Sequence, residues 1–298
     1  MTPPVSISPS TATTRALVLG ASGQIGHFLL PELVAQGVSV EAVSRDAQPA
    51  QAGVTWSRFD LYVNGDAAQR PDVVFSLGPL DGLLAWLSRT RHRPARIVAF
   101  SSTSATTKRD SPDAAERALA VHLQRCEQAL VTHCDARDIG WTILRPTLVY
   151  GCGMDANLSR IATLAQRWRF VPLPSDAIGL RQPVHAQDLA ICAGAVASAC
   201  QCLRKRYDLC GGEALSYREM VRRTVMCLNP PGRVLTLPWW LFRGMATLAV
   251  RLRLISDMTP GILERMRHDL VFSASEAERD FGWAPRPFRP QADQFPKI

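Results

Sequence analysis

The sequence predicts an α/β protein with a doubly wound parallel sheet and a small C-terminal lobe. From Arg15 onward, short apolar runs alternate with segments of helical periodicity, which is typical of βαβ units. A glycine-rich loop joins the first apolar run to the first helical segment. After Gly151 the alternation loosens, which indicates a smaller second unit.

Strands and helices are expected in the order of such a sheet. The strands are placed at 16–19, 38–43, 54–59, 72–77, 96–100 and 141–144. The helices of the first part are placed at 24–36, 80–89 and 112–136, the first kinked at Pro31 and ended by Gly37. The second part is expected to hold helices at 158–169 and 216–227, a loop through 172–174, a strand, loop and helix over 180–199, and a strand at 206–209.

The composition is that of an ordinary globular protein without a nucleic-acid-binding face. Of the 298 residues, 47% are hydrophobic and 20% are charged. The net charge of +8 comes almost entirely from arginines, which are scattered rather than gathered into a tail or stripe. The eight cysteines form no CxxC pair and no Cys/His cluster, so we expect no metal site and a reducing compartment.

The first residues look like a leader rather than a targeting signal. Residues 1–14 are rich in Ser, Thr and Pro and lack the apolar run of a secretory signal peptide. We therefore expect a disordered leader and a cytoplasmic protein.

The glycine-rich loop has the spacing GxxGxxG between a strand and a helix. Its first glycine permits a tight turn, its second lets the backbone approach a pyrophosphate, and its third lets the helix pack on the strand. Free N–H groups and the helix dipole then face the anion. The loop predicts a Rossmann-like dinucleotide-binding domain over residues 15–151, followed by a mixed substrate lobe over 152–298 with elements returning to the sheet. The loop residues assigned to the site are Gly20, Ser22, Gly23, Gln24, Ile25 and Gly26.

The end of the second strand favours NADP(H) over NAD(H). An acidic residue at this place holds a ribose diol, whereas an arginine accepts a 2′-phosphate. Here Ser44 takes the acidic place and Arg45 follows it, and a guanidinium suits a phosphate. Asp46 leaves an alternative open, because it can pair with Arg45 or face a diol itself.

Other strand ends are assigned to the same site. Asp60 follows the third strand and is placed to meet the adenine, with capping of the next turn as the alternative. Leu77 and Gly78 follow the fourth strand and are expected beside the cofactor.

Five segments carry a family resemblance. They are Phe100-Ser101-Ser102-Thr103, 144–151 (LRPTLVYG), Asn157-Leu158, 181–190 (RQPVHAQDLA) and 274–285 with Gly282-Trp283. Together they resemble the extended short-chain dehydrogenase/reductase family, the NAD-dependent epimerase/dehydratase group, over about residues 15–288. The resemblance implies a catalytic hydroxyl at Thr103. The further contacts that it implies are Ser101, Pro146 and Leu148 for the cofactor and Asn157 and Arg181 for a nucleotide or pyrophosphate of the substrate.

One part of the family pattern is missing. Family members carry Tyr-x-x-x-Lys on the helix after the fifth strand, where the Lys lowers the pKa of the phenol that moves the proton. No tyrosine and no lysine lies in 112–136 of this chain. If Glu127 marks the glutamate that usually follows the motif, Leu119 and Leu123 occupy the two places. These leucines belong to an apolar stripe at helical spacing, which is a candidate surface for a homodimer.

Three other groups are candidates for the proton transfer. Thr103 or a water can serve as a modest acid. Lys108 is expected on a loop near the cofactor, and His122 adjoins the relevant face of the long helix. A solvated lysine and a structural histidine are the alternatives for the last two.

Residues 235–255 form an apolar stretch interrupted by arginines. Arg243, Arg251 and Arg253 leave no uncharged span long enough to cross a membrane. A packed lobe helix beside an apolar substrate is one interpretation, and a helix lying on a membrane or partner surface is the other. The pair Trp239-Trp240 favours an interface.

Two functions remain open from the sequence. The first is an atypical NADP(H)-dependent oxidoreductase or epimerase-like enzyme acting on a small molecule, either a nucleotide sugar or an apolar carbonyl compound. The second is a catalytically silent NADP(H)-binding protein that acts as a sensor or assembly partner. The absent Tyr and Lys favour the second, and Thr103 with the other family motifs favours the first.

Overall fold

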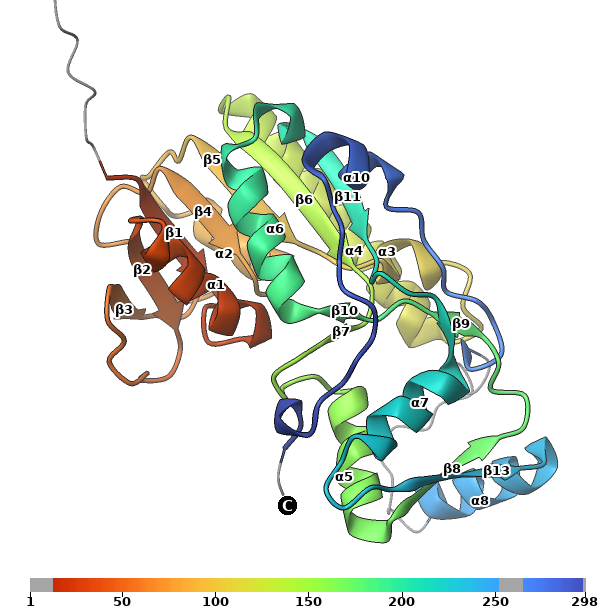
Figure 1. Cartoon of the computed structure of the whole chain (residues 1–298). Coiled ribbons are helices and arrows are strands. Elements are labelled where there is room, and N and C mark those ends of the chain that lie inside the picture. Colours follow the sequence, from red (N-terminus) through yellow and green to blue (C-terminus); the bar gives the residue numbers. More distant parts are fainter. Residues whose placement is uncertain (1–12, 252–264, 297–298) are drawn as a thin grey trace, which may run out of the picture.

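The computed structural model describes residues 13–251 and 265–296, and most of the expected leader, 1–12, lies outside the described residues. A seven-stranded sheet forms the centre of the molecule (Figure 1), in the order β11-β6-β5-β4-β1-β2-β3 with every neighbouring pair parallel. Its strands are β1 (Arg15–Leu19), β2 (Ser39–Ser44), β3 (Val54–Arg58), β4 (Val73–Ser76), β5 (Arg96–Phe100), β6 (Gly140–Pro146) and β11 (Lys205–Leu209). The predicted α/β class and doubly wound sheet are confirmed.

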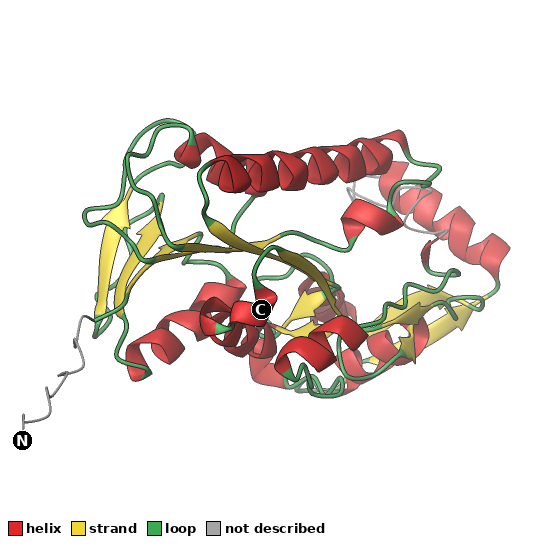
Figure 2. Ribbon diagram, turned by 90° about the horizontal axis from the view of Figure 1, so that it is seen from above, coloured by secondary structure: helices red, strands yellow, loops and turns green. Residues whose placement is uncertain are grey.

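Helices cover both faces of this sheet (Figure 2). One face carries α1 (Gln24–Ala35), α6 (Ala186–Ser198) and α10 (Ser275–Phe281), and the other carries α2 (Leu80–Leu87) and α4 (Ala114–Ala136). β1 shows why both faces are filled. Ala16 and Val18 pack into the first core, and Leu17 and Leu19 pack into the second, because successive side chains of a strand point to opposite faces.

A smaller lobe lies beyond the carboxyl ends of the strands (Figure 1). It has a core of its own, built around Leu158, Val171, Val221 and Phe288. Its elements, with the short ones that connect it to the sheet, are α3 (Ser104–Thr107), β7 (Val149–Tyr150), α5 (Leu158–Trp168), β8 (Phe170–Pro174), β9 (Leu180–Arg181), β10 (Val184–His185), β12 (Leu215–Ser216), α7 (Tyr217–Met226), β13 (Arg233–Leu237), α8 (Trp239–Arg251) and η2 (Ala292–Gln294). The short η1 (Cys200–Cys202) lies outside the lobe, between α6 and β11 and beside α10.

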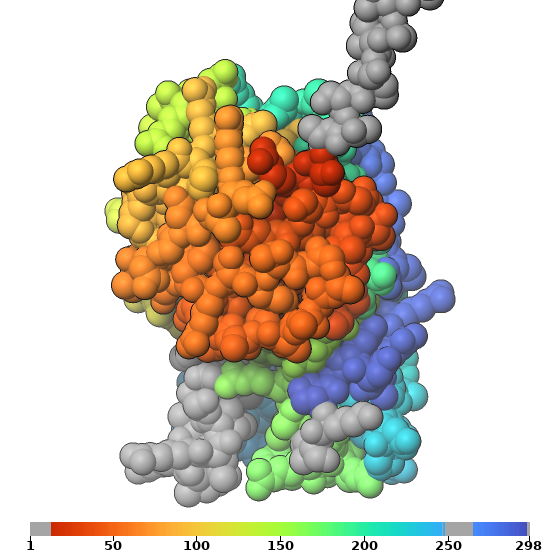
Figure 3. All heavy atoms as spheres, turned by 90° about the vertical axis from the view of Figure 1, so that its left-hand side faces the viewer, coloured from red at the N-terminus to blue at the C-terminus, as the bar shows by residue number. Residues whose placement is uncertain are grey.

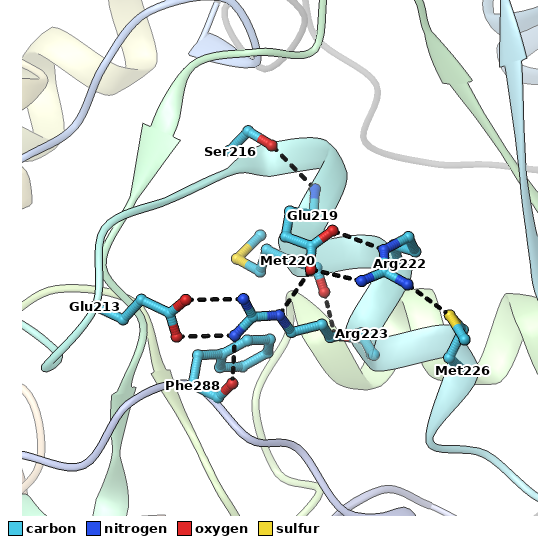
Figure 4. Close-up of polar contacts among 9 residues, drawn as sticks. Glu213, Ser216, Glu219, Met220, Arg222, Arg223, Met226 and Phe288 are labelled. Carbon is cyan, nitrogen blue, oxygen red and sulfur yellow. Dashed lines mark hydrogen bonds and ion pairs between the residues drawn. The ribbon is translucent and has the colours of Figure 1, made fainter.

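The C-terminal segment connects the two parts. It leaves α10 beside the sheet and ends at η2 beside α5 (Figure 1), and it crosses the boundary between the two parts in the space-filling view (Figure 3). Arg223 of α7 anchors it, because its guanidinium donates to the carbonyl of Phe288 and to both oxygens of Glu213 (Figure 4). Glu219 accepts from Arg222 and Arg223, so three elements of the lobe share one network of charges.

One expected loop is a strand. Residues 172–174 lie within β8, which pairs in parallel with β13. Prolines are tolerated in a strand where the missing N–H faces away from the partner. The N–H of Ser175 donates to the carbonyl of Leu237, so the odd-numbered residues face β13 and Pro172 and Pro174 face away from it.

Other boundaries differ by a residue or two from those expected. α1 runs from Gln24 to Ala35 with Pro31 inside it, and the long helix begins at Ala114 rather than at 112. The stretch 235–255 is divided between β13 and α8, and its last residues, 252–255, lie outside the described residues. Within the described part of the chain, none of the helices combines the length and the apolarity needed to cross a bilayer.

Candidate cofactor and substrate site

The glycine loop lies where the strand order reverses, between β1 and β4. Gly20 has a φ of 73°, and a Cβ there would lie 2.8 Å from the backbone N of Gly78 in the loop after β4. A Cβ on Gly26 would lie 2.0 Å from the carbonyl oxygen of Ala21. Gly20 and Gly26 are therefore required by contacts within the protein itself. Such a switch point is where ligands of open α/β sheets bind.

Gly23 differs from the other two glycines. A Cβ on it would meet only the carbonyl oxygen of Gly20, at 3.3 Å. It is the N-cap of α1, no side chain caps the helix, and no acidic residue lies in the first turn. Beside it, Oε1 of Gln24 is buried without a hydrogen-bond partner in the described residues. A helix N-terminus with free N–H groups and a close backbone approach fits the pyrophosphate of a dinucleotide.

The end of β2 places a hydroxyl beside the loop. Ser44 is buried, and its Oγ lies 3.5 Å from Oγ of Ser22 in the glycine loop. The same Oγ accepts from the N–H of Asp46 at 3.2 Å and from the side-chain amide of Gln48 at 3.2 Å. No carboxylate therefore occupies the place that usually holds a ribose diol.

Two arginines lie at this end of the sheet. Arg45 is exposed, and in the described chain no ion pair joins it to Asp46. Nε of Arg58 donates to the carbonyl of Arg45 at 3.0 Å, since Arg58 ends β3 in register with Ser44. Sequence reasoning missed Arg58, and only the pairing of β2 with β3 brings it here.

Asp60 forms a turn, which is the alternative considered from the sequence. Its Oδ1 accepts from the N–H of Tyr62 at 2.8 Å, and its backbone N–H donates to the side chain of Asn64 at 3.4 Å. Leu77 is fixed by a hydrogen bond from its N–H to the carbonyl of Leu19, next to Gly20. The adenine contact of Asp60 stays a prediction.

A buried carboxylate connects the ends of β5 and β6 to α4. Glu127 is 2% exposed and accepts from the hydroxyl of Ser101 at 2.6 Å. It also forms a bidentate pair with Arg145, whose Nε lies 2.9 Å from Oε1. Thr103 is 6% exposed and donates through its hydroxyl to the carbonyl of Pro146 at 3.2 Å. Ser101, Thr103 and Pro146 therefore lie close together at the ends of β5 and β6, and their cofactor and catalytic roles stay predictions.

Leu119 and Leu123 lie on the N-terminal half of α4. Leu119 is 40% exposed and Leu123 is partly buried, so the apolar stripe is covered only toward its C-terminal end, at Cys126 and Leu130. α4 contains no tyrosine and no lysine, and His122 is the candidate proton donor that lies on it.

Lys108 ends α3 and faces the first turn of α4. Its Nζ lies 3.5 Å from Oε1 of Glu116, which also accepts from Arg265 and from the hydroxyl of Ser111. Burial and the neighbouring Arg265 guanidinium lower the pKa of the Lys108 ammonium. Lys108 is thus a half-buried ammonium rather than a solvated one.

His122 points to a different neighbour. Its Nε2 lies 3.4 Å from Oδ2 of Asp81 on α2 and 3.7 Å from Sγ of Cys126. In the described residues, no hydrogen bond or ion pair joins His122, Lys108 and Thr103 to one another.

The two predicted substrate residues differ in exposure. Arg181 is 7% exposed and donates to the carbonyls of Leu180, Arg265 and His268, at 2.6 Å for Leu180 and 2.9 Å for His268. Asn157 is exposed at the start of α5, whose first N–H groups are capped by the buried Asp155. Sequence reasoning missed Asp155. The substrate contacts of Arg181 and Asn157 stay predictions.

Comparisons with known proteins agree with this geometry. No family model matches the chain. The chain is 24% identical over 323 residues to a 2-alkyl-3-oxoalkanoate reductase of Stenotrophomonas maltophilia, an alignment that covers 91% of this chain and 95% of that protein. The fold superposes on epimerase Mth375 of Methanothermobacter thermautotrophicus with a TM-score of 0.73 and 17% identity, covering 95% of this chain and 90% of the other. The chain has the fold of the extended short-chain dehydrogenase/reductases.

These comparisons confirm the family resemblance that the five sequence segments indicated. A further neighbour, MoeE5 in complex with UDP-glucuronic acid and NAD, superposes with a TM-score of 0.71 and 20% identity over 92% of this chain and 94% of its own. The relatives of the chain are reductase- and epimerase-type proteins, and solved neighbours hold a nicotinamide dinucleotide.

Proposed function

We propose that the chain is an NADP(H)-dependent reductase of the extended type that acts on an apolar carbonyl compound. The observation that supports this cofactor is the end of β2, where Ser44 stands at the place of the usual carboxylate and the Arg58 side chain donates to the backbone carbonyl of Arg45. Two guanidinium groups and a hydroxyl suit a 2′-phosphate, which adds about two negative charges to the ribose. The bare N-terminus of α1 would hold the pyrophosphate.

The state of Arg181 supports the apolar substrate. Its guanidinium is buried and already donates to three backbone carbonyls, so few of its N–H groups remain to bind a pyrophosphate. Burial also lowers the pKa of Arg181. The reductase of Stenotrophomonas maltophilia, aligned over nearly its whole length, acts on a 2-alkyl-3-oxoalkanoate. An alkyl-bearing ketone is therefore the substrate class that we favour over a nucleotide sugar.

The chemistry needs a proton for the carbonyl oxygen. When bound, the reduced nicotinamide supplies the hydride that reaches the carbonyl carbon. The proton must come from another group of the protein or from water, because no tyrosine and no lysine lies in 112–136. Thr103 and Lys108 are the two donors that we propose. Thr103 lies beside Pro146, and a lowered pKa makes Lys108 a better acid than a solvated lysine. His122 is the weaker candidate, because it pairs with Asp81.

NADPH oxidation tests the proposal directly. The purified chain is assayed with 2-alkyl-3-oxoalkanoates of increasing alkyl length. As a control, UDP-glucose is incubated with the chain and oxidised cofactor, and its epimerisation, which consumes no NADPH, is followed by chromatography. We expect turnover with the keto acids only. Thr103→Val or Lys108→Met should lower kcat by about a hundredfold if that group donates the proton, with a smaller effect on KM. Turnover with UDP-glucose alone would contradict the substrate class.

A catalytically silent cofactor-binding protein is the second candidate. The observation that favours it is the pair Leu119 and Leu123. This function predicts tight NADPH binding without turnover on any carbonyl in the same assay. Turnover that Thr103→Val or Lys108→Met abolishes would exclude it.

A further inference from the structure

The outer side of the small lobe exposes a set of large apolar side chains. These residues come from the end of α5, from β8 and β13, and from α8. They are Trp168 (40% exposed), Phe170 (41%), Leu235 (48%), Trp240 (73%), Leu241 (37%) and Met245 (38%). We call this set the aromatic patch. Contiguous exposed apolar surface of this kind marks an interaction site more often than single exposed residues do.

The strand register joins part of the patch into one face. β8 and β13 pair in parallel with Phe170 opposite Arg233 and Leu235 opposite Pro172. Residues that are paired in register, or two apart on one strand, share a face of the sheet. Phe170 and Leu235 therefore lie on the same face. The ring of Trp168 lies 6.4 Å from that of Phe170 and extends the patch to the end of α5.

α8 continues the patch on the neighbouring surface. The helix lies alongside β8 and β13 at the end of the molecule remote from β3 (Figure 1). Phe242 is 2% exposed and holds the helix to the lobe. Trp240, Leu241 and Met245 are left on its outer side, where no other described element covers them.

Arginines predominate among the charged residues of the segments that form the patch. Residues 158–175 and 227–251 contain no aspartate and no glutamate, although the chain has 26 acidic residues in all. The arginines in the two segments are Arg160, Arg167, Arg169, Arg233, Arg243 and Arg251. The segments that form the patch therefore carry positive charge alone, and the neighbouring Asp176 is paired with Arg267. An anionic partner complements this charge.

We propose that the aromatic patch binds the surface of an anionic lipid bilayer. Tryptophan is enriched at membrane–water interfaces, and arginines beside it attract acidic headgroups. A second copy of the chain is a poorer partner, because a twofold contact would bring the same arginines of both copies together. The bound orientation leaves β1 and β2 at the end of the molecule away from the bilayer (Figure 1).

Vesicle cosedimentation of the full chain tests this proposal. The probes are phosphatidylcholine vesicles with and without one third phosphatidylglycerol. We expect binding to the anionic vesicles only, and we expect added salt to weaken it because charge attraction is screened. The double variant Trp240→Ser, Leu241→Ser should lower the partition coefficient about tenfold, as should Arg233→Gln, Arg243→Gln.

Matched variants on the sheet domain are the controls. Val63 and Ile191 are exposed apolar residues, and Arg91 and Arg93 are exposed arginines. Val63→Ser with Ile191→Ser, and Arg91→Gln with Arg93→Gln, should leave vesicle binding unchanged. Circular dichroism and NADPH binding verify that every variant is folded. Equal binding of all variants would overturn the proposal, and so would a dimer in analytical ultracentrifugation that Trp240→Ser dissociates.

Discussion

Gly23 and Gly26 are three residues apart and are glycines for different reasons. At Gly26 a Cβ would overlap the carbonyl of Ala21, whereas at Gly23 a small shift accommodates it. Gly26→Ala should therefore destabilise the fold by about 3 kcal/mol or more, because α1 must move away from the loop that follows β1. Gly23→Ala should leave the urea midpoint nearly unchanged and weaken NADPH binding at least about tenfold. A Gly23→Ala chain that binds NADPH normally would contradict the placement of the pyrophosphate.

At the residue scale, local motifs were predictable and non-local neighbours were not. The glycine loop, Ser44 and Arg45 lie within one βαβ unit, so their spacing along the chain is close to their spacing in the fold. Arg58 is far from Arg45 in sequence and reaches it only through the register of β2 and β3. The partners of Arg181, around residues 265–268, are more distant still.

Glu127 determines how α4 lies against the sheet. Its carboxylate holds Ser101 of the β5 end and Arg145 of β6 in a buried site. Glu127→Leu leaves the Arg145 guanidinium without its main partner and should cost about 3 kcal/mol in urea unfolding. Glu127→Gln keeps a hydrogen-bond acceptor and should cost less. Equal losses for the two variants would mean that the charge of Glu127 is not what holds α4.

The charge network of the lobe gives its stability a pH dependence. Hydrogen bonds from Arg222 and Arg223 lower the pKa of Glu219 to about 2, and Arg223 lowers the pKa of Glu213. A carboxyl whose pKa is lower in the folded state stabilises the fold above its unfolded pKa, and this stabilisation is lost as the pH falls toward the folded pKa. The urea midpoint should therefore fall between about pH 5 and pH 2.

Arg223→Met tests the origin of that pH dependence. The variant should lose about 1 kcal/mol at pH 7 and show a shallower fall in acid, because Glu219 keeps only Arg222. Arg109→Met, which removes an exposed pair with Asp110, is the matched control and should behave like the unmodified chain. A parallel fall for Arg223→Met and the unmodified chain would assign the acid sensitivity to other carboxyls.

At the element scale, the sheet was predictable because its strands are short apolar runs between turn residues. The six strands expected in the first part and the one expected at 206–209 are all present. Their ends are shifted by one or two residues, because hydrogen bonding rather than composition sets the last residue. The sequence analysis missed β8 because Pro172 and Pro174 suggested a loop. In the structure the two prolines face away from β13, so the pairing of the strands does not need their missing N–H groups.

At the scale of the whole molecule, the parallel sheet brings distant motifs to one end. The loops after β1, β2, β4, β5 and β6 all open at the carboxyl edge, where the small lobe lies (Figure 1). Because the sequence motifs indicated a parallel doubly wound sheet, they also predicted that these loops gather at one edge of it. They did not predict that Arg181 is buried against backbone carbonyls or that large apolar side chains are exposed together on the outer side of the lobe. Both depend on how the lobe packs.

Titration of NADPH and NADH into the chain, Arg45→Ala and Arg58→Ala tests the central claim most directly. The unmodified chain should bind NADPH at least about tenfold more tightly than NADH, since each arginine adds a charge-assisted contact to the 2′-phosphate. Each variant should lose most of that preference and keep its affinity for NADH within about twofold. Equal affinity of the unmodified chain for the two cofactors, or an equal loss of both in the variants, would contradict the account.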